Sequence, residues 1–218
     1  ISTLVVSFVI GSSLLFLGRH AKKRINFIEQ LLLIIFVYLL VSFFIALPFY
    51  LSNYQVTFLN AMFEATSGTT GTGFSIFKNI KYLDPTLILW RSSSQWIGGL
   101  YFLFFLILIF SNKQFNYKMN DLTHSGDGRI NSESNIKDLL SKIFIFYSLL
   151  SFNIFLLLNI SDVRMFNSLN LSMSLVSAGG FIPTDSLSKI IYSNPQKIIF
   201  IFSLLFSMLN FFLILNIF

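Results

Sequence analysis

Long apolar runs separated by short polar stretches form the main pattern of this chain. Five runs contain no charged residue and are long enough to cross a bilayer as helices: 1–18, 31–51, 92–110, 143–160 and 198–218. Roughly 20 helical residues match a hydrocarbon core about 30 Å thick. The pattern therefore predicts five transmembrane helices.

Two further apolar segments, 57–66 and 165–176, are too short to cross. A helix of ten residues reaches only about 15 Å, half of the core. A glycine-rich stretch follows each segment, at 67–74 and at 177–181. Non-helical backbone at membrane depth is tolerated only where it is buried in protein or lines a watery cavity. Both segments are therefore predicted to be re-entrant half-helices that lead into loops facing a pore.

The placement of basic residues tests this topology, because they collect on the cytoplasmic side of membrane spans. With both short segments re-entrant, one side carries Arg19, Lys22, Lys23, Arg24, Lys113, Lys118, Arg129, Lys137 and Lys142. The other side carries Lys78, Lys81, Arg91, Arg164, Lys189 and Lys197. The first side is therefore predicted to be cytoplasmic, and this asymmetry would be lost if segment 57–66 crossed the membrane.

The composition excludes the soluble classes of protein. Of 218 residues, 55% are hydrophobic and 11% are charged, with a mean hydropathy of +0.75. The net charge of +6 comes from basic residues in the gaps between apolar runs, which indicates membrane orientation and no nucleic-acid partner. The chain has no cysteine, and His20 and His124 have no neighbours at ligand spacing. We predict neither an enzyme nor a covalently bound cofactor.

The sequence contains an internal repeat. Asn60, Ser67, Gly73 and Phe74 each recur as the same residue type 107 positions later, at Asn167, Ser174, Gly180 and Phe181. The repeated unit is a span, a half-helix, a glycine loop and a span. Both units run in the same direction through the membrane, unlike the inverted repeats of many carriers. The predicted fold is an all-α integral membrane protein with five transmembrane helices and two re-entrant pore helices, arranged as two parallel repeats.

The glycine loops suit the binding of a cation. A ring of backbone carbonyls from several loops can replace the hydration shell of an ion, and glycine permits the backbone angles that such a loop requires. The hydroxyls of Thr69, Thr70, Thr72 and Ser177 would add oxygens or hydrogen-bond the loop. The negative C-terminal end of a pore helix also favours a cation.

Packing is the alternative role for these glycines, because glycine is common in membrane helices. For Gly98 and Gly99, inside an uncharged span, we prefer close packing as the explanation. Glu64 and Arg91 are ionisable residues at or near the membrane. One hypothesis pairs them behind the filter as a brace, and the alternative places both among lipid headgroups. No comparable charged partner is visible for the second loop.

These motifs resemble the Trk/Ktr/HKT potassium transporters, and the Trk-type membrane subunit most closely. The first-repeat likeness rests on residues 63–74 (FEATSGTTGTGF), 89–92 (LWRS) and 95–99 (QWIGG). The second rests on 166–167 (FN) and 178–181 (AGGF). The resemblance implies four repeats around one pore, of which this chain is a fragment holding the first two. It implies this division: 1–30, the end of an N-terminal hairpin and a basic cytoplasmic loop; 31–110, repeat 1; 111–137, a cytoplasmic linker; 138–218, repeat 2.

The resemblance also implies site residues. The ion-binding filter would comprise Thr70, Gly71, Thr72, Gly73, Ser177, Ala178, Gly179 and Gly180. Glycine at positions 73 and 180 resembles the potassium-preferring members. Gly71 and Ala178 stand where the family usually has threonine, and Tyr101 replaces a small residue after Gly98 and Gly99. These departures bear on filter rigidity and helix packing.

The expected function is uptake of K⁺, the transported ion, across the cytoplasmic (inner) membrane by a multi-pass protein. By the resemblance, the partners would be the missing C-terminal pore repeats, a second copy in a homodimer, a cytoplasmic nucleotide-binding regulatory subunit and the lipid membrane. Two alternatives remain: a non-conducting membrane scaffold, and a carrier for another small solute or cation. A carrier predicts inverted repeats and an ionisable residue at the midplane.

Overall fold

The computed structural model describes residues 2–19, 26–110 and 133–207. Within these ranges the regular structure is entirely helical, as the sequence predicts for an all-α membrane protein. The seven α-helices are α1 (Ser2–Gly18), α2 (Phe27–Tyr50), α3 (Phe58–Thr69), α4 (Pro85–Phe110), α6 (Glu133–Ile160), α7 (Met165–Val176) and α8 (Asn194–Ser207). Two 3₁₀ turns complete the elements, η1 (Ile80–Tyr82) and η2 (Leu187–Lys189).

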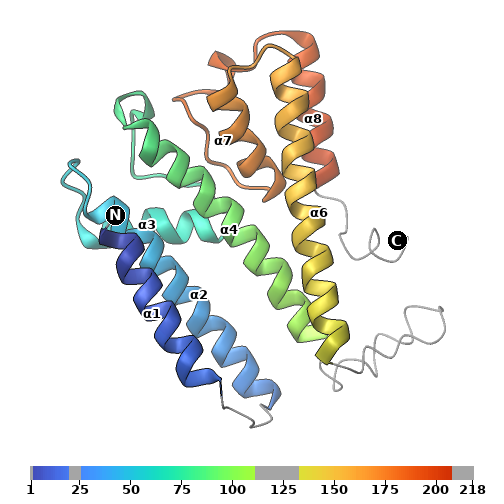
Figure 1. The fold of residues 1–218 in the computed structure, drawn as a ribbon. Helices are drawn as coiled ribbons and strands as arrows, with labels where there is room; N and C mark the ends of the chain where they lie inside the picture. The colour runs from blue at the N-terminus through green and yellow to red at the C-terminus, as the bar shows by residue number, and fades with distance from the viewer. Residues whose placement is uncertain (1, 20–25, 111–132, 208–218) are drawn as a thin grey trace, which may run out of the picture. The chain divides into compact units, whose positions relative to one another are not determined.

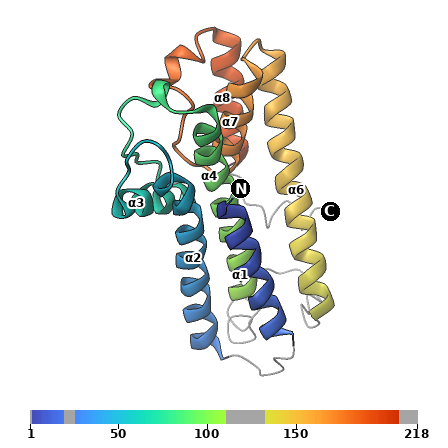
Figure 2. The ribbon, with the colours of Figure 1, turned by 60° about the vertical axis from the view of Figure 1, so that its left-hand side comes forward.

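The chain divides into two compact units, Ile1–Ala65 and Thr66–Phe218. In the first unit, α1 and α2 pack side by side (Figures 1 and 2). Helix α2 begins after Asn26, whose backbone N–H donates to Glu29 Oε2 at 3.1 Å. This bond satisfies one backbone donor next to the first helical turn.

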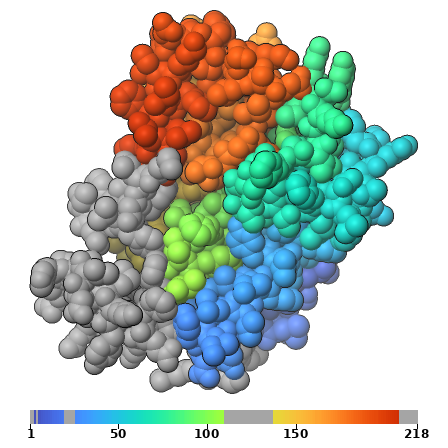
Figure 3. Space-filling view, turned by 180° about the vertical axis from the view of Figure 1, so that it is seen from behind, coloured from blue at the N-terminus to red at the C-terminus, as the bar shows by residue number. Residues whose placement is uncertain are grey.

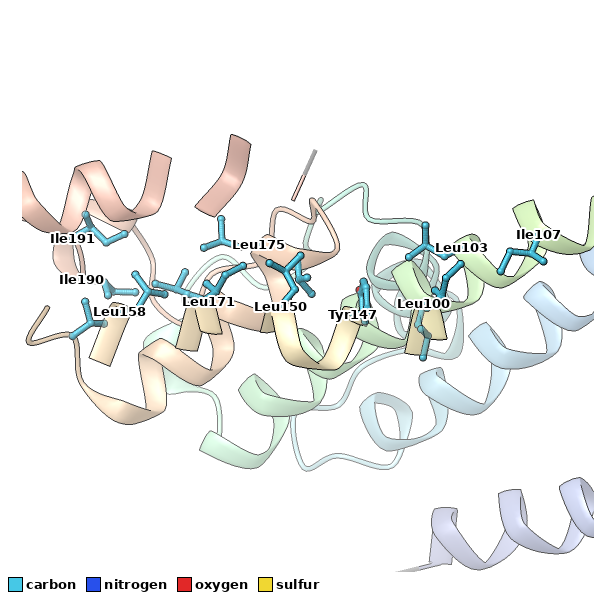
Figure 4. Packing of buried hydrophobic residues seen from close by; sticks show 14 residues of the cluster. Leu100, Leu103, Ile107, Tyr147, Leu150, Leu158, Leu171, Leu175, Ile190 and Ile191 are labelled. Atoms are coloured by element: carbon cyan, nitrogen blue, oxygen red, sulfur yellow. The ribbon is translucent and has the colours of Figure 1, made fainter. Parts of the chain in front are cut away.

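In the second unit, α7 packs against α4, α6 and α8 (Figure 1). The buried hydrophobic cluster follows these contacts along α4, α6 and α7 and ends at Ile190 and Ile191 before α8. Figure 4 shows Tyr147 of α6 in this row, between Leu150 and Leu100 in the view. The short helix α7 is therefore held by apolar packing on several sides, which leaves its C-terminal end in a defined place.

The element bounds repeat with the sequence period. The first and last residues of α7 are the repeat counterparts of those of α3, and the bounds of η2 correspond in the same way to those of η1. Both α3 and α7 have 12 residues, so each is about 18 Å long and cannot cross a bilayer core of about 30 Å. The two short helices and their spacing agree with the predicted repeat.

Three of the described helices are long and apolar enough to cross a membrane: Phe27–Tyr50, Pro85–Ile109 and Lys137–Ile160. They correspond to the second, third and fourth predicted spans. The first predicted span forms α1, which has 17 residues. The fifth is described only to Ser207, as the end of α8.

Several predictions concern segments outside the described residues. They include the basic residues at 20–25, most of the predicted linker, His20, His124 and the last part of the fifth apolar run. Among the described residues, no group of histidine, cysteine, aspartate and glutamate is placed to hold a metal ion.

Candidate functional site

Helices α3 and α7 end with the same backbone hydrogen bonds. After α3, the N–H of Gly71 donates to Gly68 O at 3.0 Å, and the N–H of Thr72 donates to Ser67 O at 3.0 Å. This pair of bonds is the Schellman motif, in which the residue after the cap adopts a left-handed conformation. Gly71 has that conformation, with φ +69°.

The corresponding bonds follow α7. The N–H of Ala178 donates to Leu175 O at 3.0 Å, and the N–H of Gly179 donates to Ser174 O at 2.8 Å. Ala178 occupies the left-handed position with φ +51°. A non-glycine residue in this region costs about 1–2 kcal/mol. The predicted loops therefore share one backbone design, and the second carries strain that the first avoids.

The two predicted filter glycines meet in the structure. A Cβ built on Gly73 would lie 2.6 Å from Gly180 Cα, a distance that real Cβ atoms essentially never show. Gly73 has φ +79°, whereas the φ of Gly180 is not positive. Of these two glycines, only Gly73 has the expected left-handed backbone, while a Cβ on Gly180 would make a tight contact of 3.2 Å with Gly73 Cα. Two loops in contact do not by themselves enclose an ion.

The hydroxyl groups beside the glycines hydrogen-bond the loops. Thr70 Oγ1 donates to Thr66 O at 2.7 Å and lies 2.6 Å from Thr72 Oγ1. Ser177 Oγ lies 3.0 Å from both Met173 O and Ser174 O. Of the two roles predicted for these hydroxyls, the structure shows the bracing of the loops.

Gly98 and Gly99 of α4 lie against the C-terminal ends of α3 and α7. A Cβ on Gly98 would overlap the backbone of Thr69 at the end of α3. A Cβ on Gly99 would lie 2.6 Å from Tyr147 Oη and 2.8 Å from Ser177 Cβ. The predicted close packing is confirmed, and its partners are the C-terminal ends of the two short helices and a tyrosine of α6.

Arg91 contacts the second loop. Its guanidinium carbon lies 4.3 Å from the Phe181 ring centroid and 5.9 Å from that of Phe77, and Nη1 makes a long hydrogen bond of 3.5 Å to Ile182 O. Arg91 of the first repeat thus braces the second loop, for which the sequence showed no charged partner. Cation–π stacking of an arginine that is 1% exposed supplies the brace.

Glu64 is buried as well, at 0% exposure, which argues against the headgroup placement for this carboxyl group. It belongs to the first compact unit and Arg91 to the second. Their pairing stays a prediction.

Sequence reasoning missed the role of Gln95, which lies one helical turn after Arg91 on α4. Its Oε1 accepts hydrogen bonds from Ser174 Oγ at 2.8 Å and from the backbone N–H of Phe181 at 3.2 Å. The next residue, Trp96, donates from Nε1 to Ser151 Oγ at 2.8 Å, and its carbonyl accepts from Tyr147 Oη at 3.1 Å. The sequence feature that could have indicated this role is an uncharged amide inside an apolar span, close to Gly98 and Gly99.

The segments that follow the two loops also lie side by side, as residues 74–84 (green) and 181–193 (orange) show in Figure 3. Asp185 joins them, because its carboxylate accepts from the N–H of Lys81 at 3.2 Å and from Lys189 Nζ at 3.3 Å. The Lys81 hydrogen bond, followed by Lys189, lowers the pKa of Asp185 below its ordinary value.

Comparison with protein families decides the membership of this chain, because the model of the cation transport protein TrkH matches residues 1–218. The chain belongs to the TrkH family. With three helices able to span a bilayer, this TrkH-family chain is part of a membrane protein.

Named relatives agree with the family. An uncharacterized cation transporter of Methanocaldococcus jannaschii is 30% identical over 71% of this chain and 33% of its own length. The Trk system potassium uptake protein TrkG of Escherichia coli is 25% identical over 82% of the chain and 38% of its own length. TrkH of Salmonella typhimurium is 25% identical over 84% of the chain and 39% of its own length. The chain thus spans little more than a third of these relatives, whose names describe transport and no enzymatic reaction.

Proposed function

We propose that this chain supplies two of the pore repeats of a potassium uptake protein of the cytoplasmic (inner) membrane. In this proposal, α3 and α7 are re-entrant pore helices and the five apolar runs span the membrane. Residues 31–110 and 138–218 are the repeats, joined by a cytoplasmic linker at 111–137 and preceded by the end of a hairpin at 1–30.

One observation carries the proposal: two helices of equal length end in the same hydrogen-bonded turn, and the glycines that follow, Gly73 and Gly180, meet. Each helix directs the negative end of its dipole towards this meeting point. Carbonyl oxygens of residues 70–73 and 177–180 are the proposed ligands of K⁺, because backbone oxygens can replace its hydration shell without a fixed charge.

The remaining half of the carbonyl ring would come from further repeats of the same protein. This chain covers 33% to 39% of the three relatives named above, which leaves room for two more units. A homodimer in the lipid membrane and a cytoplasmic nucleotide-binding regulatory subunit complete the proposed assembly.

A second function, a non-conducting membrane scaffold, fits the isolated chain. The backbone contact between Gly73 and Gly180 leaves no ring for an ion between these two loops alone. We therefore expect residues 1–218, reconstituted as monomers, to give no rubidium flux. Detectable flux from such monomers would contradict the requirement for four loops.

The decisive experiment is rubidium uptake by potassium-starved cells that carry the full-length protein, with sodium as competitor. The Gly73→Arg variant should abolish uptake, because a bulky cation would enter the proposed filter. Gly18→Arg is the matched control, since a Cβ at Gly18 meets nothing within 4 Å. Uptake that resists sodium and is lost only in Gly73→Arg supports the proposal. Absence of uptake in the correctly inserted parent protein favours the scaffold.

A further inference from the structure

Gln95 is a neutral amide buried in the apolar helix α4, with a side chain that is 0% exposed. Burial of such a group costs free energy unless its polar atoms are hydrogen-bonded. Only its oxygen is used among the described residues, because Nε2 has no hydrogen-bond partner there. The hydrogen bonds of this buried amide are therefore those that its Oε1 atom accepts.

Oε1 holds both ends of the second loop. One donor, Ser174 Oγ at 2.8 Å, lies in the last turn of α7, and the other, the N–H of Phe181 at 3.2 Å, follows Gly180. A single acceptor therefore fixes the distance between the two flanks of residues 175–180. Gly179 lets the amide lie against the loop, since a Cβ there would overlap the Gln95 side chain.

The first loop has no such acceptor among the described residues. Ser67, the first-repeat counterpart of Ser174, is 6% exposed, and its Oγ has no hydrogen-bond partner in that part of the chain. The second-repeat counterpart of Gln95 is Phe202, which is 68% exposed. We call the two hydrogen bonds from Ser174 Oγ and the Phe181 N–H to Gln95 Oε1 the bracket. Among the described residues, the bracket joins Gln95 of the first repeat to the loop of the second repeat and has no counterpart at the first loop.

We propose that Gln95 is a positioning residue that fixes the width of the second filter loop, so that a helix of one repeat sets the ion preference of the next repeat's loop. This inference rests on the proposed potassium pore. Loss of the acceptor would leave the Phe181 N–H and the Ser174 hydroxyl without their partner. The loop flanks would then separate, and the carbonyls of residues 177–180 would adapt to ions of other sizes.

Gln95→Met tests the bracket, because methionine is similar in length and has no amide oxygen. Gln196→Met is the matched control: Gln196 is also buried, and its Oε1 accepts from the N–H groups of Tyr192 and Ser193 at 3.1 and 3.2 Å, away from the filter loops. Both variants remove a buried glutamine that holds backbone, so both should lower stability. Only Gln95→Met should change ion preference.

The first measurement is the ratio of rubidium to sodium uptake by the full-length protein. We expect a several-fold fall for Gln95→Met, a smaller fall for Ser174→Ala, which removes one of the two donors, and the parental ratio for Gln196→Met. Gln95→Glu keeps an acceptor oxygen and should retain more of the parental ratio than Gln95→Met does. An unchanged ratio in both Gln95→Met and Ser174→Ala would overturn the proposal, as would an equal fall in Gln196→Met.

The second measurement, amide hydrogen exchange at Phe181 in the purified full-length protein, needs no conduction. The Phe181 amide should be protected in the parent and in Gln196→Met and should exchange faster in Gln95→Met. If the parent transports no ion but shows this pattern, the bracket holds and the pore proposal fails. Equal protection in the parent and Gln95→Met would overturn the bracket even if the protein conducts. Should Gln95→Met fail to insert, Ser174→Ala carries the uptake test.

Discussion

Gly71 and Ala178 occupy the same position in two matched helix ends, and both have left-handed backbone, with φ +69° and +51°. The second helix end tolerates an alanine where the first has glycine, and the same two hydrogen bonds close both turns. Since glycine adopts this backbone without a Cβ penalty, the pair allows the cost of that methyl group to be measured inside one molecule.

We expect Ala178→Gly to raise the free energy of unfolding by about 1 kcal/mol, because it relieves the left-handed strain. Thermal unfolding of the full-length protein in detergent measures the change. Ala61→Gly in the interior of α3 is the control and should lower stability by about 1 kcal/mol or more, since there glycine only weakens the helix. A loss of stability in Ala178→Gly would argue against strain at this position.

Gly98→Ala should destabilise the protein by about 2 kcal/mol, because its Cβ would meet the backbone of Thr69, which moves only with the end of α3. Gly11→Ala on α1 is the control: its Cβ meets nothing within 4 Å, and alanine favours a helix over glycine by about 1 kcal/mol. Unfolding in detergent should therefore shift in opposite directions for the two variants. A stabilising Gly98→Ala would contradict the close approach.

The predicted pairing of Glu64 and Arg91 can be tested by a double-mutant cycle. Their counterparts in the second repeat are Leu171 and Ile198, so Glu64→Leu and Arg91→Ile give the first repeat the residues of the second. A buried charge that loses its partner costs about 3–5 kcal/mol, so we expect each single variant to be strongly destabilised and the double variant to recover part of the loss.

Additive effects in that cycle would show that Arg91 stabilises the protein independently of Glu64. Arg91→Ala should in either case damage assembly, because it also removes the cation–π contact at 4.3 Å. Normal assembly and conduction in Arg91→Ala would refute the bracing role.

Asp185 should titrate below the ordinary aspartate pKa of 3.8, mainly because its carboxylate accepts the Lys81 N–H. The folded pKa is lowered, so the stabilising contribution is present above the unfolded pKa and is lost as pH falls through the lowered folded pKa. Carbon NMR of the labelled side chain measures the midpoint. Asp185→Asn should remove this transition and speed amide exchange at Lys81, and a midpoint at or above 3.8 would contradict the contact.

The repeat and the two short helices could be predicted from sequence, although α3 continues past its predicted end at residue 66, to Thr69. The helix lengths and ends depend on local properties: the length of an apolar run limits what can cross a membrane, and a residue with left-handed backbone, commonly glycine, ends many helices. The pairs Gly73 and Gly180 or Ser67 and Ser174 made the period visible without any knowledge of contacts.

The tertiary structure decided which residues hold the loops. Gln95 accepts a hydrogen bond from the N–H of Phe181 in the next repeat, and Arg91 stacks on the ring of the same phenylalanine. Gly99 lies in close contact with Ser177. These contacts do not follow the period of the sequence, because each joins a helix of one repeat to the loop of the next. A pattern along one chain shows which residues are alike, and only packing in space determines which of them touch.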